Sequence, residues 1–264
     1  MFDERDASAR DGCAGAASPA VPEYLERVYW WAYLRPASIR IFDHPAMVQA
    51  ILWGQYRRLS DRVLARITPG ARVLQLACVY GDLSKRLARH VGPTGALDIV
   101  DVAPIQIAHL RTKLAGHHRV RATVADATTP QADRFDCVLS FFLLHELPDP
   151  LKRRVVDAAL AAVVPGGRAV FVDYARPARW HPLRPVMAAV FAALEPYATA
   201  MWRTPITDMA SRSEGFAWSR TSHFGGLYQV VVAERAGGST ARPVVRDGAL
   251  PVSAEGRPVA VENV

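Results

Sequence analysis

The clearest indication of this chain's fold is the segment Val73-Leu74-Gln75-Leu76-Ala77-Cys78-Val79-Tyr80-Gly81-Asp82. Its first four residues form an apolar run, a loop with one glycine follows, and a helical pattern begins near Gly81. A buried strand that turns directly into a helix is the opening unit of a parallel α/β sheet. Ligands of such sheets bind beyond the carboxyl ends of the strands, where a helix N-terminus favours a carboxylate. We therefore expect a ligand over the loop from Ala77 to Asp82.

The same alternation of strand and helix continues along the chain. Further apolar runs lie near Leu97–Val100, Val120–Val124, Cys137–Phe141 and Ala169–Val172, and helical stretches lie at Gly81–His90, Pro104–Leu114 and Asp149–Val164. Pro165-Gly166-Gly167 predicts a tight turn from the last of these helices into the fifth strand. Two final strands, Ala217–Phe224 and Leu227–Glu234, are joined by Gly225-Gly226, which predicts a two-residue hairpin turn. The fold class is therefore α/β, with five parallel strands and an antiparallel C-terminal hairpin.

Three other segments have compositions of their own. Residues 21–60 are rich in aromatic side chains at helical spacing, which predicts an N-terminal helical cap. Within 175–216 apolar residues recur every three or four positions, which predicts an amphipathic helical insertion before the sixth strand. These residues are Leu183, Val186, Met187, Val190, Phe191 and Leu194. Residues 1–20 and 237–264 lack any period and are expected to be disordered. The chain is predicted to be a single domain over residues 21–236.

Charge and cysteine content narrow the functional class. The net charge is +7, but lysine occurs at only three positions and the arginines are scattered without a basic block. No nucleic-acid partner is therefore expected. Cys13, Cys78 and Cys137 form no Cys-x-x-Cys pair, which favours a reducing compartment over a disulfide framework or zinc cluster. The charged start and the lack of any run of ~18 apolar residues predict a cytoplasmic protein.

Five parallel strands followed by an antiparallel hairpin resemble the class I S-adenosylmethionine (SAM)-dependent methyltransferase fold over about residues 59–235. That family opens with an acidic residue and alternating glycines, whereas this chain has Gln75, Ala77, Val79 and Gly81 at those positions. Asp101 and Asp126 end the second and third strands, where the family binds the ribose hydroxyls and the adenine. The resemblance implies that SAM is bound by Gln75, Ala77, Cys78, Val79, Gly81, Asp101, Val102, Asp126 and Ala127. The alternative is that both aspartates only cap the helices that follow them.

Several unusual strings carry a closer resemblance. They are Tyr29-Trp30-Trp31-Ala32-Tyr33, Ile51-Leu52-Trp53-Gly54, Ala77 to Asp82, Phe141-Phe142-Leu143-Leu144-His145-Glu146, and Val172-Asp173-Tyr174 with Trp180-His181-Pro182-Leu183-Arg184. Their order and spacing resemble the RquA family of rhodoquinone biosynthesis proteins over about residues 21–232. This resemblance implies ubiquinone as substrate, exchange of a ring methoxy group for an amino group, SAM as amino donor, and manganese as the metal.

The sequence suggests a physical reason for amination in place of methylation. Gln75 stands where ordinary relatives carry the acid that helps to hold the α-ammonium of SAM. An opposite charge nearby stabilises the protonated form of an amine. We hypothesise that, without this carboxylate, the amine more readily becomes neutral and nucleophilic.

The candidate catalytic residues are Tyr80, Asp82, His145 and Glu146, because their loops should open at the same edge of the sheet. Asp82 and His145 are also the candidate manganese ligands, since manganese prefers oxygen and imidazole donors. Each has a simpler alternative: Asp82 caps the following helix, Glu146 is solvated, and His145 only forms hydrogen bonds in the pocket. Tyr174 is a weaker catalytic candidate.

The amphipathic insertion favours a peripheral position at the inner face of the cytoplasmic membrane. Trp180, Arg179 and Arg184 precede its apolar residues, and aromatic and basic side chains suit an interfacial helix. The alternative is a lid packed on the core. Two other functions remain open: an ordinary SAM-dependent methyltransferase acting on a quinone, lipid or other small hydrophobic molecule, and a non-catalytic binding protein. Nothing in the sequence indicates an oligomeric state.

Overall fold

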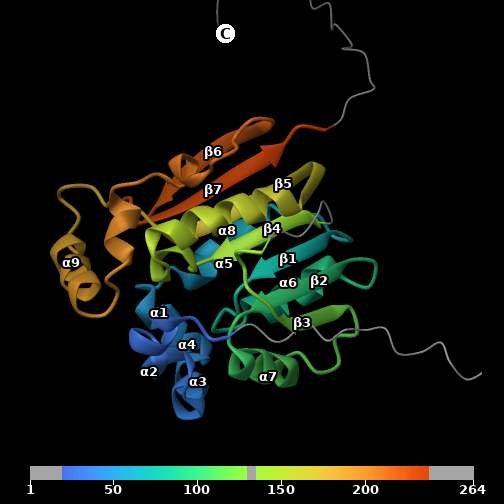
Figure 1. Cartoon of the computed structure of the whole chain (residues 1–264), viewed down its shortest axis with the longest axis horizontal. Helices are drawn as coiled ribbons and strands as arrows, with labels where there is room; N and C mark the ends of the chain where they lie inside the picture. Colours follow the sequence, from blue (N-terminus) through green and yellow to red (C-terminus); the bar gives the residue numbers. More distant parts are fainter. Residues whose placement is uncertain (1–19, 130–134, 238–264) are drawn as a thin grey trace, which may run out of the picture.

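The computed structural model describes residues 20–129 and 135–237, and within them the predicted α/β fold is confirmed. The seven strands follow the order β3-β2-β1-β4-β5-β7-β6 (Figure 1). Their bounds are β1 (Arg72–Leu76), β2 (Ala96–Asp101), β3 (Val120–Val124), β4 (Phe135–Phe141), β5 (Val163–Tyr174), β6 (Phe216–His223) and β7 (Tyr228–Arg235). The first five are parallel, and β7 pairs antiparallel with both β5 and β6. The predicted disordered ends lie almost entirely outside the described residues.

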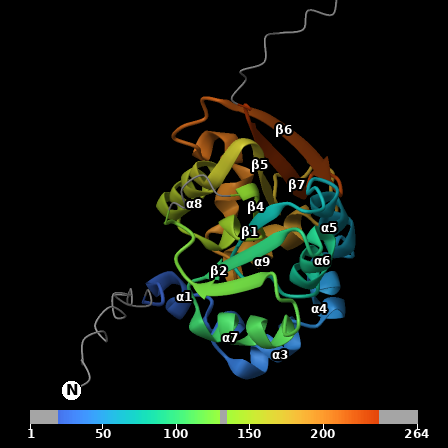
Figure 2. The same ribbon diagram turned by 90° about the vertical axis from the view of Figure 1, so that its right-hand side faces the viewer.

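Helices cover both faces of the sheet. They include α5 (Tyr56–Leu64), α6 (Leu83–Val91), α7 (Pro104–Lys113) and α8 (Asp149–Ala162). Figure 2 shows α8 on one face and α5 and α6 on the other. The strands β1, β4 and β5 are buried along most of their length, which explains why their sequences are continuous apolar runs instead of alternating ones.

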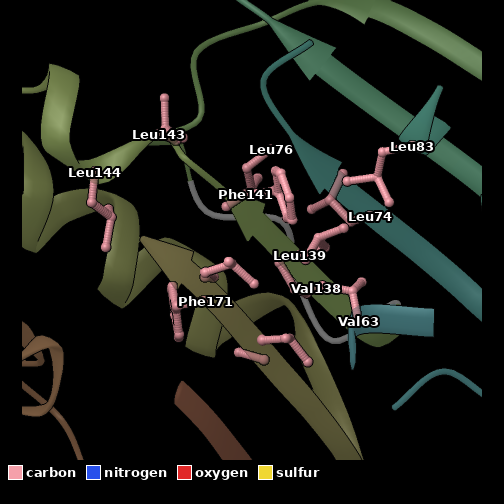
Figure 3. Close-up of a cluster of buried hydrophobic side chains, with 14 of the residues drawn as sticks. Val63, Leu74, Leu76, Leu83, Val138, Leu139, Phe141, Leu143, Leu144 and Phe171 are labelled. Atoms are coloured by element: carbon pink, nitrogen blue, oxygen red, sulfur yellow. The ribbon is translucent and has the colours of Figure 1, made fainter. Parts of the chain in front are cut away.

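The core lies where the first helices pack on the central strands. Figure 3 shows Val63 of α5 and Leu83 of α6 against Leu74 of β1 and Leu139 of β4. All four side chains are essentially inaccessible to water. Burial of a side chain of this size contributes about 1.5–3 kcal/mol, so this layer holds the strand that carries the first loop rigidly in place.

Two predicted turns differ from the structure. The helix α8 ends at Ala162, and β5 begins at Val163, before the Pro-Gly-Gly segment. The pairing of β4 with β5 shifts register across this segment, so Pro165 to Gly167 form an irregularity within the strand. In the hairpin, β6 ends at His223 and β7 begins at Tyr228, so a four-residue loop replaces the expected two-residue turn. Phe224 shares the positive φ of the two glycines, at 50°, which extends the loop by one residue on that side.

The predicted cap and insertion both consist of helices. The cap contains α1 (Glu23–Arg27), α2 (Trp30–Tyr33), α3 (Pro36–Phe42) and α4 (Pro45–Ile51), followed by α5. The insertion contains α9 (Arg184–Ala193) and the short 3-10 helices η2 (Ala198–Trp202) and η3 (Ile206–Met209), and a third short helix, η1 (Leu144–Glu146), follows β4. Figure 1 shows the cap and α9 beyond the arrowheads of the parallel strands. They therefore border the edge at which a ligand is expected.

Candidate active site

A cavity lies at the carboxyl ends of the first four strands, beneath the cap. Its lining brings together six of the predicted SAM-binding residues: Ala77, Cys78, Asp101, Val102, Asp126 and Ala127. Cap residues such as Tyr24, Leu25 and Tyr33 close it from above, and Phe142 and Glu146 border it after β4. The cavity thus combines carboxylates with aromatic and aliphatic walls, as a nucleoside-like ligand requires.

Asp101 is held rigidly at the end of β2. Its Oδ2 accepts a hydrogen bond from the Cys78 backbone N–H at 2.7 Å, and its Oδ1 accepts one from the Ala103 N–H at 2.8 Å. Burial raises the pKa of Asp101, while these backbone donors lower it. At the end of β3, Asp126 accepts the Thr128 N–H at 2.8 Å. Both carboxylates therefore organise their own loops and also face the cavity, so capping and ligand binding are compatible.

Three residues predicted to bind SAM do not line this cavity: Gln75, Val79 and Gly81. The Gln75 side chain is fully buried, where its Oε1 accepts the Ser84 hydroxyl at 3.0 Å and its Nε2 donates to the Ala77 carbonyl at 2.9 Å. It lies beneath the loop and positions it. Any effect of Gln75 on a bound amine must therefore act through the loop or at a distance.

The loop after β1 has two unusual backbone positions. Ala77 has φ of 68°, a left-handed conformation that glycine adopts without strain and alanine does not. It occupies the position of the family's first glycine, so the geometry is kept although the residue has changed. Gly81 has φ of 86°, and a Cβ there would lie 2.6 Å from the Tyr56 hydroxyl. This close approach explains why the last glycine is present.

The cap is tied to the same loop by polar contacts. The Gly81 N–H donates to Asp43 Oδ1 at 3.0 Å, and Lys113 Nζ forms ion-pair contacts with Asp43 and donates to the Gly81 carbonyl. Tyr80 donates its hydroxyl to the Ala32 carbonyl at 2.8 Å. The cavity roof and the cavity floor are therefore one connected unit.

A second group of titratable side chains lies beside the cavity, around His145 of η1. His145 Nδ1 contacts Asp173 Oδ1 of β5 at 3.1 Å. On the other side of the ring, Nε2 lies 3.8 Å from Glu146 Oε1 and 3.9 Å from Glu195 Oε2. The other atom of the Asp173 carboxylate accepts the Leu144 N–H at 2.9 Å. One imidazole thus stands among three carboxyl groups from three different segments.

Burial and charge act in opposite directions on this cluster. Burial alone lowers the pKa of His145, but Asp173, with Glu195 and Glu146, raises it to about 9. Burial raises the pKa of Glu146 to about 7, although His145 and the Tyr33 hydroxyl lower it. Burial also raises the pKa of Glu195. At neutral pH the imidazole is therefore a cation, and Glu146 is poised between its two forms.

Aromatic rings enclose the cluster. The hydroxyl of Tyr33, from the cap, donates to Glu146 Oε1, and the rings of Tyr174 and Phe142 meet the His145 ring edge-on at 4.8 and 5.9 Å. Phe142 adopts φ of 53°, a strained value for a bulky residue. Such walls lower the local dielectric, which strengthens every electrostatic interaction inside.

The predicted catalytic residues fall into separate places. His145 and Glu146 are neighbours in the cluster. Tyr80 lies in the cap interface, where its ring stacks on Tyr33 at 5.4 Å. Asp82 precedes α6 and has a buried oxygen, Oδ1, without a hydrogen-bond partner. Among the residues that the structure describes, no contact joins Asp82 to His145, and no group of three or more His, Cys, Asp and Glu side chains is arranged to hold a metal ion.

Three members of the cluster are absent from the sequence-based prediction: Tyr33, Asp173 and Glu195. Asp173 is a carboxylate at the end of an otherwise apolar strand, 1% exposed, and that position could have marked it. Glu195 follows an apolar helix in the insertion, and Tyr33 lies among many aromatic residues of the cap. The sequence positions of Glu195 and Tyr33 therefore do not distinguish these two residues from ordinary surface or core residues.

Comparison with known proteins shows what parts of this chain resemble. Residues 73–167 match the family described as "Methyltransferase domain". The ubiquinone biosynthesis O-methyltransferase of Xanthomonas campestris pv. campestris (strain B100) is 32% identical over 165 residues, which are 61% of this chain and 66% of that protein. The ubiquinone/menaquinone biosynthesis C-methyltransferase of Saccharophagus degradans is 34% identical over 121 residues, 43% of this chain and 47% of that protein. The chain thus matches just under two thirds of the length of the first relative and about half of the second.

Solved structures agree on the fold. An O-methyltransferase family protein from Burkholderia thailandensis superposes with a TM-score of 0.56 at 18% identity, over 80% of this chain and 70% of that one. The N-methyltransferase NodS from Bradyrhizobium japonicum WM9 gives a TM-score of 0.50 at 16% identity, over 68% of this chain and 96% of its own. The chain therefore has the fold of the class I SAM-dependent methyltransferases, and residues 73–167 resemble a methyltransferase domain.

Proposed function

We propose that this chain is a SAM-utilising transferase that acts on a quinone, and that it converts ubiquinone to rhodoquinone with SAM as the amino donor. The observation that carries the proposal is the His145 cluster, a cationic imidazole and a half-titrated carboxyl group that adjoin a cavity suited to SAM. Two relatives, an O-methyltransferase and a C-methyltransferase, are named as ubiquinone biosynthesis enzymes, which supports the substrate class. The resemblance to the RquA family supplies the amination step.

The lining of the cavity fits SAM in chemistry: Asp101 and Asp126 offer carboxylates where a ribose and an adenine are expected. When bound, SAM would supply its α-amino nitrogen: the ring carbon–nitrogen bond would form, the bond to the methoxy oxygen would break, and methanol would leave. Loss of a proton from the β-carbon of the SAM amino-acid part, with cleavage of its Cα–N bond, would then free the aminoquinone and leave an α,β-unsaturated carboxylate on the sulfonium. This sequence of steps needs no oxidant or reductant.

The residues of the cluster have the protonation states that such an exchange requires. His145, held as a cation by Asp173, can give a proton to the departing methoxide. Glu146, with a pKa of about 7, can take the proton that the attacking amine releases. The aromatic walls exclude water, which would otherwise compete with nitrogen at the ring.

Methyl transfer is the second candidate, and the likeness to a ubiquinone biosynthesis O-methyltransferase favours it. In that reaction Glu146 would remove the proton from a ring hydroxyl group, and no proton donor would be needed. The same site residues would then hold the quinone ring in another orientation. The two reactions differ in their products, so they are separated by experiment.

Manganese, which the RquA resemblance implies, remains a separate proposal. In the described residues the cluster around His145 does not fit a metal, because Nδ1 of the ring is already engaged by Asp173 and no three donors converge on one point. No step is therefore assigned to a metal. Titration of the protein with Mn²⁺, followed by changes in its paramagnetic resonance signal, tests for a site elsewhere.

The test of function uses SAM labelled with nitrogen-15 at the α-amine, short-tail ubiquinone, and Mn²⁺ present or omitted. Mass spectrometry of the extracted quinone should show the label in an aminoquinone. A quinone that has gained a methyl group instead would establish the second candidate. Binding of SAM without any change in the quinone would refute the quinone assignment and leave the fold assignment intact.

Two variants of Gln75 test whether the lost acid matters. Gln75→Glu adds a negative charge beneath the loop and loses the donation to the Ala77 carbonyl, whereas Gln75→Leu loses that bond and the one from Ser84 without adding charge. If the charge stabilises the ammonium form of the amine, Gln75→Glu suppresses amination more strongly than Gln75→Leu. Equal losses would show that the residue acts only by positioning the loop.

We also propose a peripheral position at the inner face of the cytoplasmic membrane, through α9. No helix in the described part of the chain is long and apolar enough to cross a bilayer. Between Pro185 and Leu194, α9 and its C-cap carry no charged residue, and Trp180 just before it is 79% exposed. Such a helix suits the interface, where it would give a long isoprenoid tail a path to the site.

A further inference from the structure

The exposed large hydrophobic side chains are not scattered over the molecule. Within residues 20–129 and 135–237 nine such side chains are exposed, and all fall in two short stretches. Three belong to the insertion around α9. The other six belong to the cap: Trp30, Trp31, Ile41, Met47, Ile51 and Trp53. We call these six residues the cap patch. Exposed apolar residues that gather on one segment indicate an interaction surface, whereas single ones do not.

Within the stretch that carries the cap patch the exposed charges have one sign, and the exposed carboxylates Glu23, Glu26 and Asp61 lie just outside it. From Trp30 to Arg58 every exposed charged side chain is an arginine, namely Arg35, Arg40, Arg57 and Arg58. The only carboxylate in this stretch is Asp43, which is partly buried and paired with Lys113. The Arg35 guanidinium lies 4.0 Å from the centre of the Trp30 ring, a cation–π contact. The patch therefore offers aromatic rings and a local excess of positive charge together.

The backbone conformation at Trp53 holds one side chain of the cap patch toward solvent. Trp53 is 40% exposed and has φ of 50°, a left-handed value that a bulky residue adopts rarely. Such strain persists where the surrounding structure holds the residue in place. Here the strained turn presents an indole to solvent, although a turn of this kind usually contains a small polar residue or glycine.

The cap patch and α9 border the same side of the molecule. Figure 1 shows α1–α4 and α9 beyond the arrowheads of the parallel strands, and Figure 2 shows them on the far side of the sheet from the viewer. Tyr197, which follows α9, packs with Leu25 and Tyr29 of the cap. The cap and the insertion therefore lie together at the end of the molecule that carries the cavity.

We propose that the cap patch is a docking surface for an anionic phospholipid bilayer, acting together with α9. The aromatic and aliphatic side chains would enter the interface, and the arginines would contact lipid phosphates. The alternating apolar and basic residues favour lipid over a second copy of this chain, whose identical patch would bring arginines against arginines. This inference concerns lipid binding alone and does not depend on the quinone assignment.

The test is flotation of the purified full chain on density gradients with vesicles, in the absence of SAM and quinone. One set of vesicles is phosphatidylcholine, and the other is an equal mixture of phosphatidylglycerol and phosphatidylcholine. The protein should float with the second set. Because each basic residue near an anionic surface contributes about fivefold to partitioning, Arg40→Gln with Arg57→Gln should weaken binding about 30-fold.

A matched control variant loses the same number of positive charges, but outside the cap patch. Arg212→Gln with Arg220→Gln alters two exposed arginines of the β6 region and should leave flotation unchanged. Ile41→Ser with Ile51→Ser removes apolar contact from the patch and should weaken binding about tenfold without affecting the core. Circular dichroism of each variant confirms that it is folded.

Three results would overturn the proposal. The first is failure of the wild-type protein to float with either vesicle set. The second is equal loss in the two arginine double variants, which would show that only net charge matters. The third is a stable dimer in solution that dissociates in the Ile41→Ser, Ile51→Ser variant, which would assign the patch to self-association.

Discussion

Replacement of Asp173 by Asn tests the electrostatics of the cluster most directly. The substitution preserves the shape of the side chain, and its amide oxygen can still accept the Leu144 N–H that Asp173 accepts at 2.9 Å. The Tyr174 N–H, which the other carboxylate oxygen accepts at 2.7 Å, loses its acceptor, and that loss is the same at every pH. The substitution also removes the charge that contributes most to raising the pKa of His145, after burial has lowered it. We therefore expect the pKa of His145 to fall well below about 9 in Asp173→Asn.

The magnitude follows from linkage. His145 has a pKa of about 9 in the folded protein, against 6.5 for an ordinary histidine. One pKa unit corresponds to about 1.4 kcal/mol, so the shift is worth about 3 kcal/mol. The folded-state pKa is the higher one, so this stabilisation is fully present below pH 6.5 and is lost as the pH rises through about 9. Asp173→Asn should thus destabilise the protein by about 3 kcal/mol in acid and by much less above pH 9.

The assay is urea unfolding followed by circular dichroism across this pH range, for the wild type and the variant. Asp98→Asn is the control. Asp98 lies on β2 and pairs with the exposed Arg121 at 2.9 Å, whereas the cluster is formed around η1 and β5. The small effect of this control should not change over the window in which His145 titrates. A penalty for Asp173→Asn that is equal at every pH would refute the reasoning, since a purely structural loss has no such dependence.

Three further outcomes are expected. Asp101→Asn should weaken SAM binding at least tenfold in isothermal titration calorimetry, because a neutral amide bonds a ribose hydroxyl less strongly than a carboxylate does; unchanged affinity would place SAM elsewhere. Ala77→Gly should raise the free energy of unfolding by about 0.5–1 kcal/mol in urea titration, because φ of 68° strains alanine; destabilisation would contradict the backbone geometry. Tyr33→Phe should raise the pKa of Glu146 further above about 7, because the hydroxyl that lowers it is lost, and nuclear magnetic resonance of the carboxyl carbon would follow the titration.

How well each feature was predicted from the sequence depends on how far apart in the chain the residues that determine it lie. The first loop was predictable because an apolar run, a glycine and a helical pattern are adjacent in the chain. Asp101 and Asp126 were predictable as a pair, since parallel strands bring their carboxyl ends to one edge. The hairpin loop was mispredicted because the two glycines suggested a short turn, whereas Phe224 also adopts a positive φ. Gln75 was placed at the ligand by analogy, but its side chain found partners within the core.

The class of the fold, the order of its elements and the edge at which a ligand is expected follow from local patterns in the chain, because periodicity and turn chemistry are local. The composition of the cluster, in contrast, depends on contacts between distant segments. Tyr33, His145, Asp173 and Glu195 come from the cap, η1, β5 and the insertion, and no spacing in the chain relates them. Their charges act on one another only at the short distances that folding creates, in an interior where water no longer screens them.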